Sequence, residues 1–253
     1  MTTKKYTYED FLDIIKALRS ENGCPWDREQ THNSLRPCLM EEAAEVLAAI
    51  RILEQTGSCD NLREELGDVL LQVVMHAEIA KEEDLFTMED VVNEVAEKMV
   101  RRHPHVFGEI KVDDSGQVLE NWEEIKKREK GGKTYITSPL KEIPMELPSL
   151  TRATKVIKRI NQLYEPLEGK DIYANAVKQL CNATDRLSGL QLSDCNKEVS
   201  KAIEDILLSV AEISYVNKLS PEQILADRIE DIIDAYEGVE RKGYNTSKSR
   251  KYQ

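Results

Sequence analysis

The sequence has few of the residues that mark sheets, disulfide frameworks or clusters of soft metal ligands. Its 253 residues include only 11 glycines, 4 histidines and 5 cysteines, and no two cysteines stand in a CxxC pair. The scarcity of glycine and of β-branched runs favours an all-α fold. An odd number of cysteines without such a pair is typical of reduced thiols, so we expect a cytoplasmic protein.

Long apolar runs and an excess of basic charge are also missing. No stretch approaches the roughly 18 apolar residues of a membrane span, and the first residues contain no apolar signal core. We therefore expect no membrane partner. The 47 acidic residues outnumber the 35 Lys and Arg, which gives a net charge of −12. This balance argues against nucleic acid as the main partner. It is compatible with a small anionic substrate held by a metal ion and a local basic cluster.

What the sequence does contain is helical periodicity along most of its length. We expect a first helical domain over residues 1–130, a linker rich in Gly and Pro over 131–149, and a second domain over 150–253. Thr7 is a candidate cap for the first helix, and Thr87 starts a helix of the same domain. Individual helices are predicted over residues 8–21, 117–130, 150–164, 171–189, 195–217 and 221–238.

Two helices joined by a short break carry paired acids. Glu42 and Glu45 stand three residues apart on one face, Glu41 can join them, and Glu65 and Asp68 repeat the spacing on the next helix. Helices connected by a short loop tend to pack antiparallel, so the acids can converge. Crowded carboxylates repel one another unless a cation lies between them. Oxygen ligands suit Mg²⁺, with Mn²⁺ as an alternative. The competing interpretation is that the acids are simply solvated.

Apolar residues recur on one side of both acidic helices with the same period of 3.6 residues. They include Leu39, Leu47 and Leu66. One thin helical bundle could hardly cover all of these apolar faces. This pattern is one of the two grounds on which we expect a homodimer.

A basic cluster stands at the end of the helix that Thr87 starts. Lys98 and Arg102 are four residues apart and share a face, and Arg101 adjoins them. These cations can complement the negative end of the helix. They can equally hold phosphate oxygens, which arginine grips through two N–H groups. All three are candidate substrate-binding residues.

The loop after the first helix contains Trp26 and His32, and a second pair of histidines follows the basic cluster. Trp26 and His32 could line a pocket for a nucleoside base, although a lone Trp is often a packing residue. His103 and His105 resemble a metal-ligand pair at first sight. Their two-residue spacing suits an extended chain and further His or Cys ligands are lacking nearby, so we favour a structural role.

The second half of the chain has the helix layout of the first half without its charges. When Asn182 is aligned with Glu45, Asp205 falls on Asp68 and is the one acid retained. Aligning the helix starts places Asp231 on Lys98. Acidic and basic groups are thus lost together, as expected if they belong to one shared site. The second domain is interpreted as degenerate and non-catalytic.

These motifs closely resemble those of the MazG family, which belongs to the all-α nucleoside triphosphate pyrophosphatases. The segments that carry the resemblance are GCPWD at 23–27, QTH at 30–32, EEAAE at 41–45, ELGD at 65–68 and RRHPHVFG at 101–108. The resemblance implies tandem helical bundles that form a homodimer. It also implies Mg²⁺-dependent hydrolysis of ribo- and deoxynucleoside triphosphates to the monophosphate and pyrophosphate.

The resemblance also implies roles for individual residues. Glu41 would either support the metal ligands from behind or assist the attacking water, and Lys98 and Arg102 would hold the triphosphate. The Mg²⁺ ligands would be Glu42, Glu45, Glu65 and Asp68.

Two other functions are weighed against this one. A redox di-iron bundle would use Glu-x-x-His pairs, and histidine is absent from the acidic motifs. A non-catalytic nucleotide-binding or regulatory protein of the same fold would bind nucleotides without releasing product.

Overall fold

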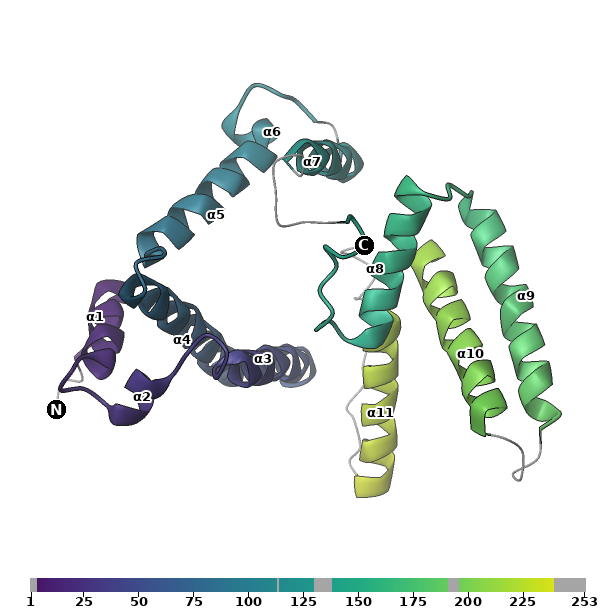
Figure 1. Cartoon of the computed structure of the whole chain (residues 1–253), viewed down its shortest axis with the longest axis horizontal. Helices are drawn as coiled ribbons and strands as arrows, with labels where there is room; N and C mark the ends of the chain where they lie inside the picture. Colours follow the sequence, from purple (N-terminus) through teal and green to yellow (C-terminus); the bar gives the residue numbers. More distant parts are fainter. Residues whose placement is uncertain (1–3, 113, 130–137, 191–195, 239–253) are drawn as a thin grey trace. The chain divides into compact units, whose positions relative to one another are not determined.

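The computed structural model describes residues 4–112, 114–129, 138–190 and 196–238. In these residues every regular element is a helix, which confirms the predicted all-α class (Figure 1). The described residues form two compact units, 4–129 and 138–238. Within this part of the chain no helix combines the length and the apolar character that crossing a membrane requires.

The first unit contains seven helices among its described residues, and α4 packs against three of them. It contacts α1, α3 and α5, and a cluster of Ile15, Leu35, Val74, Met75 and Ile79 forms the core of the unit. Burial of these aliphatic side chains is the main stabilising contribution. The helices are α1 (Tyr8–Arg19), α2 (Pro25–Glu29), α3 (Arg36–Thr56), α4 (Asp60–Glu82), α5 (Met88–Arg102), α6 (Pro104–Phe107) and α7 (Ser115–Glu129).

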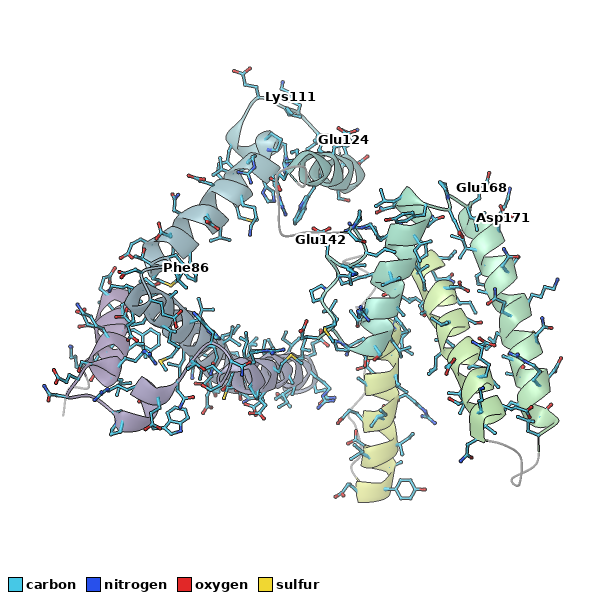
Figure 2. All side chains as sticks on the ribbon, in the orientation of Figure 1. Phe86, Lys111, Glu124, Glu142, Glu168 and Asp171 are labelled. Carbon is cyan, nitrogen blue, oxygen red and sulfur yellow. The ribbon has the colours of Figure 1, made fainter. Side chains whose placement is uncertain are left out.

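The helix starts follow the local signals in the sequence. Thr7 and Thr87 each form a complete capping box with the acid three residues later. Each box satisfies N–H groups that the first helical turn leaves without partners. Phe86 lies at the turn from α4 into α5 (Figure 2). The predicted starts at residue 8 and after Thr87 are therefore confirmed.

Two short helices are not among those predicted from the sequence. Residues 25–29 form α2 within the predicted loop, and Pro104 begins α6 between the two histidines. Proline favours the first turn of a helix, which explains why α6 begins at Pro104. The ring centroid of His103 lies 5.6 Å from that of His105. The Nδ1 atom of His103 is 2.6 Å from the carbonyl oxygen of Met99.

The loop between α1 and α2 is held in place by Arg19, whose side chain is only 5% exposed. Its guanidinium donates to both carboxylate oxygens of Glu82 on α4, at 2.9 and 2.6 Å. It also donates to the carbonyl oxygen of Asp27. A side chain at Gly23 would collide with the carbonyl oxygens of Ala17 and Leu18 at the end of α1, so the turn needs glycine there.

The apolar stripe of the α3–α4 hairpin faces outward in this chain. We call these six side chains the hairpin stripe; each is between 38% and 64% exposed. The inward positions are taken instead by Cys38 on α3, Met75 on α4 and Leu35 directly before α3. An apolar surface of this kind is typical of an interaction face. The stripe consists of Leu39, Met40, Leu47, Ile50, Leu66 and Leu70.

The second unit repeats the pattern of contacts between helices that is found in the first unit. Its helices are α8 (Ser149–Leu163), α9 (Gly169–Ser188), α10 (Asn196–Val216) and α11 (Pro221–Glu237). Helix α10 contacts α8, α9 and α11, as α4 contacts α1, α3 and α5. This agreement supports the interpretation of the second half as a second copy.

In the second unit, side-chain hydrogen bonds are found before α8 and at the start of α11. Before α8, Glu142 accepts a hydrogen bond from Arg159 at 2.9 Å (Figure 2). At the start of α11, Ser220 accepts from the backbone N–H of Gln223. Residues 131–137 of the predicted linker lie outside the described residues, as do residue 130 and residues 239–253 of the two predicted domains.

Candidate functional site

The α3–α4 hairpin brings together acids that are far apart in the sequence. One carboxylate oxygen from each of Glu42, Glu45 and Glu65 lies within 4.8 Å of the others. Glu42 and Glu65 are half-buried, whereas Glu45 is exposed. Helix α3 presents Glu42 and Glu45 one turn apart, and α4 brings Glu65 against them. We call these three side chains the acidic cluster.

Asp68 and Glu41 act on this cluster through their charge. The pKa of Glu42 is raised above its ordinary value, mainly because the carboxyl is partly buried. The negative charges of Asp68, Glu65 and Glu41 add to the effect in that order. A neighbouring anion favours the protonated form of an acid, so the raised pKa reports mutual repulsion. All the acids singled out in the two motifs thus belong to one electrostatic unit.

The donor chemistry of the cluster fits a hard divalent cation. Its three members offer only carboxylate oxygens, which are the ligands that Mg²⁺ and Mn²⁺ prefer. A cation among these residues would relieve the repulsion that Glu42 experiences. The cluster contains no histidine, so it does not have the ligand set of the di-iron alternative.

Asn61 supports the cluster from the start of α4 and was missed in the sequence analysis. Its amide Nδ2 donates a 2.6 Å hydrogen bond to Oε1 of Glu65. A hydrogen bond of this kind restricts the carboxylate to one orientation. The four-residue spacing between Asn61 and Glu65 was the signal that could have identified this contact.

The basic residues at the end of α5 form ion pairs with α7. Glu129 accepts from Nε of Arg101 at 2.7 Å, and from Nε and Nη2 of Arg102 at 3.0 and 2.5 Å. Hydrogen bonding to Arg102 is the main reason why the pKa of Glu129 is lowered to about 2. A guanidinium has five N–H donors, so both arginines keep donors for a further partner. Lys98, one turn earlier, is half-buried.

Trp26 and His32 have different environments. Trp26 on α2 is 61% exposed, so it does not serve as a buried packing residue within this chain. His32 stacks on His76 of α4, with their Nδ1 atoms 2.8 Å apart. The pKa of His76 is lowered, first by burial and then by His32. His76 was not predicted as a partner of His32, because nothing in the sequence relates the two residues.

The second unit has an ion pair where the first has its acidic cluster. Asp205 of α10 accepts a 2.6 Å hydrogen bond from Arg186 of α9 and lies 3.1 Å from Nζ of Lys201. These cations lower the pKa of Asp205. The retained acid is therefore satisfied by its own unit. Among the residues that the structure describes, the acidic cluster is the one group of potential ligands for a metal ion.

Comparison with known proteins agrees with the resemblance that the sequence motifs show. The MazG nucleotide pyrophosphohydrolase domain matches residues 30–107, which include both acidic motifs and the basic cluster. The nucleoside triphosphate pyrophosphohydrolase/pyrophosphatase MazG of Thermotoga maritima is 36% identical over 234 residues, which are 92% of this chain and 85% of that protein. This similarity extends through both units.

Other relatives match a smaller part of this chain. The nucleoside triphosphate pyrophosphohydrolase of Escherichia coli is 46% identical over 149 residues, 58% of this chain and 55% of that protein. The uncharacterized protein YabN of Bacillus subtilis is 49% identical over 153 residues. That match covers 60% of this chain but only 30% of the relative, so the chain spans much less than the length of some proteins that it matches.

Proposed function

This chain belongs to the MazG family of nucleotide pyrophosphohydrolases, and from that premise we propose that it hydrolyses nucleoside triphosphates to the monophosphate and pyrophosphate. The single observation that carries the proposal is the approach of Glu42, Glu45 and Glu65 to within 4.8 Å. In a member of this family, such a cluster has a ready chemical use in holding the cation that accompanies a triphosphate.

The acids of the hairpin would hold Mg²⁺, or Mn²⁺ in its place. Glu42, Glu45 and Glu65 would provide ligands directly, with Asp68 as a further ligand beside Glu42. Asn61 would keep Glu65 oriented through its hydrogen bond. The bound ion would supply charge neutralisation at the phosphate oxygens and would lower the pKa of a water molecule.

The basic residues of α5 would hold the triphosphate. Lys98 and Arg102, with Arg101 beside them, would offset the negative charge that grows on the pyrophosphate leaving group. Glu129 would keep the guanidinium planes of both arginines in place through its hydrogen bonds. Preorganised donors of this kind avoid the cost of reorganisation during the reaction.

The exposed carboxylate of Glu41 would accept the proton of the attacking water. The oxygen of that water would form a bond to the α-phosphorus while the bond to the pyrophosphate oxygen breaks. Trp26 and His32 would line the pocket of the nucleoside base. The exposed Trp26 ring is free to stack on a base.

Pyrophosphate release is the measurement that tests the proposal. Wild-type protein with Mg²⁺ and each common ribo- and deoxynucleoside triphosphate should release pyrophosphate and the monophosphate. Glu42→Ala and Asp68→Ala should each lower the rate at least about 100-fold, because several kcal/mol of electrostatic stabilisation are lost. Asp205→Ala is the matched control, since it removes the aligned acid of the second unit, and it should retain the rate.

Two outcomes would contradict the proposal in different ways. Unchanged turnover in Glu42→Ala or Asp68→Ala, with helical content intact by circular dichroism, would refute the assignment of the metal ligands. Nucleotide binding without any product from the wild-type chain would favour the non-catalytic regulatory function instead.

The remaining parts of the proposal concern assembly and surroundings. The exposed hairpin stripe supports a homodimer, since burying it would remove a large apolar surface from water. The described cysteines, Cys24, Cys38, Cys59 and Cys181, are free thiols, which supports a cytoplasmic location. The net charge of −12 supports a small nucleotide rather than nucleic acid as the partner.

A further inference from the structure

Gln72 on α4 is a buried polar residue whose acceptor atom has no hydrogen-bond partner. Gln72 is only 6% exposed, and its Oε1 atom is fully enclosed. Almost all buried polar atoms in folded proteins are hydrogen-bonded, because an unpaired one destabilises the fold. The proposed mechanism assigns no role to this atom.

The position of Gln72 connects two features of the first unit. It is seven residues after Glu65 and four residues before His76, so all three share one face of α4. Glu65 meets the acids of α3 at one end of this face, and His76 meets His32 at the other. At 1.5 Å per residue, Gln72 lies about 10 Å along the axis from Glu65 and about 6 Å from His76.

The residues around this part of the hairpin are apolar. One turn before Glu42 on α3 stands Cys38, which packs with Leu71 of α4 against the core of the unit. An apolar wall with a small number of polar atoms is typical of a pocket that binds the flat part of a cofactor or substrate. If the triphosphate lies at the acidic cluster, the nucleoside end extends away from it, and Gln72 is about two turns along α4 from Glu65.

The second unit does not have an unpaired polar side chain and a histidine at the aligned positions. The alignment that places Asp205 on Asp68 places Ser209 on Gln72 and Ile213 on His76. Ser209 is fully buried, but its hydroxyl donates to the carbonyl oxygen of Asp205 at 2.8 Å within its own helix. At this aligned position, the buried side chain with an unpaired polar atom is Gln72, in the unit that has the acidic cluster, whereas the hydroxyl of Ser209 is paired.

We propose that Oε1 of Gln72 accepts a hydrogen bond from the nucleoside part of the substrate, which makes Gln72 a specificity-determining residue. The donor is either an N–H group of the base or the 2′-hydroxyl of the ribose. The inference rests on the proposed hydrolysis of nucleoside triphosphates. A site that pairs its buried acceptor with a substrate donor rejects the analogue that lacks the donor, because the acceptor is then left unpaired.

The test compares the full-length wild type with Gln72→Met, which keeps the volume of the side chain and removes the acceptor. The kcat and KM of both proteins are measured with Mg²⁺ for the four common ribonucleoside triphosphates and the matching deoxynucleotides. We expect the wild type to discriminate by about 10-fold in kcat/KM, mainly through KM. Gln72→Met should lose that discrimination while kcat for the poorer substrates stays the same.

The two possible donors give different results. If a base N–H group is the donor, the preference among the four bases disappears in Gln72→Met. If the 2′-hydroxyl is the donor, the ratio between each ribonucleotide and its deoxynucleotide disappears. Calorimetric binding of the nucleoside monophosphates, measured without turnover, should show the same loss of discrimination.

Controls separate this inference from the function on which it rests. Ser209→Ala alters the aligned residue of the second unit and should keep the wild-type ratios. Gln72→Asn, which withdraws the acceptor by one methylene group, gives the same test if Met is not tolerated. Ratios in Gln72→Met equal to those of the wild type would overturn the inference, as would a wild type that is active but does not discriminate. A wild type without pyrophosphate release would overturn the proposed function.

Discussion

At the scale of single residues, Glu42 is a carboxyl group that the fold holds close to other negative charges. Partial burial and the charges of Asp68, Glu65 and Glu41 raise its pKa. Because the pKa in the folded state exceeds the unfolded value of 4.5, the contribution of Glu42 to stability is fully present below that pH. It is lost as the pH rises through the folded value. Near neutral pH the ionised carboxylate therefore destabilises the metal-free first unit.

We predict that Glu42→Gln raises the thermal midpoint of the metal-free protein at neutral pH. The substitution keeps the shape of the side chain and removes the charge that the other acids repel. Adding Mg²⁺ should raise the midpoint of the wild type and have much less effect on the variant, because a ligand that binds only the folded state stabilises it. Differential scanning calorimetry gives both values.

Glu64→Gln is the control for this prediction, since Glu64 is exposed on the same helix and outside the cluster. It should change neither the midpoint nor the response to Mg²⁺. A lower midpoint in metal-free Glu42→Gln than in the wild type would show that the cluster is not under repulsion.

At the scale of helices, the contact between α5 and α7 depends on a charged connection. Glu129 of α7 binds Arg101 and Arg102 of α5, and the side chains of Glu129 and Arg102 are only 18% and 16% exposed. Hydrogen bonds between charged partners are stronger when water is largely excluded. The connection also determines how the two guanidinium groups are presented to a phosphate.

We predict that Glu129→Gln destabilises the first unit by about 1–3 kcal/mol, because the arginines lose a charged partner. The pKa of Glu129 is about 2 in the folded state, against an ordinary value of 4.5. Its stabilising contribution is therefore present above pH 4.5 and is lost as the pH falls towards 2. Urea unfolding at neutral pH and at pH 3 measures the difference between variant and wild type.

Tryptophan fluorescence makes this measurement specific to the first unit, since both tryptophans, Trp26 and Trp122, lie in it. Glu94→Gln, an exposed substitution on α5, serves as the control. The stability difference between Glu129→Gln and the wild type should shrink at pH 3. A difference that is the same at both pH values would show that the charge of Glu129 is not responsible.

At the scale of the whole molecule, two units with the same helix order have different chemical content. The first places carboxylates together between α3 and α4, whereas the second joins α9 and α10 through Arg186 and Asp205. The first unit also exposes the hairpin stripe on the same two helices that carry the acids. A dimer that forms through the stripe would therefore fix the position of α3 and α4, and with them the acidic cluster.

We predict that Leu66→Glu converts a homodimer into a monomer. Leu66 is 52% exposed in the stripe. Burying a charge in an apolar interface costs more free energy than the apolar contacts at that position contribute. Sedimentation equilibrium should give about twice the chain mass of 28.9 kDa for the wild type and the chain mass for the variant. Met145→Glu, at a position that is 78% exposed in the second unit, should leave the dimer intact. A monomeric wild type would contradict the prediction.

The sequence by itself determined the helices and the content of the acidic motifs. Thr7 and Thr87 start helices through hydrogen bonds to residues three positions away, and Glu42 and Glu45 share a face because they are three residues apart. Such interactions depend on neighbours within one turn, so periodicity and caps predict them. The short helices α2 and α6 escaped prediction, because a single turn has too little periodicity to detect.

Only the tertiary structure decided which distant residues meet. The pairs His32–His76 and Arg102–Glu129, the burial of Gln72 and the outward direction of the hairpin stripe all depend on how helices pack against one another. No spacing rule connects residues that lie 27 or 44 positions apart. Their contacts arise from the crossing of whole helices around a shared core, where the burial of many apolar side chains outweighs the preference of any one polar group.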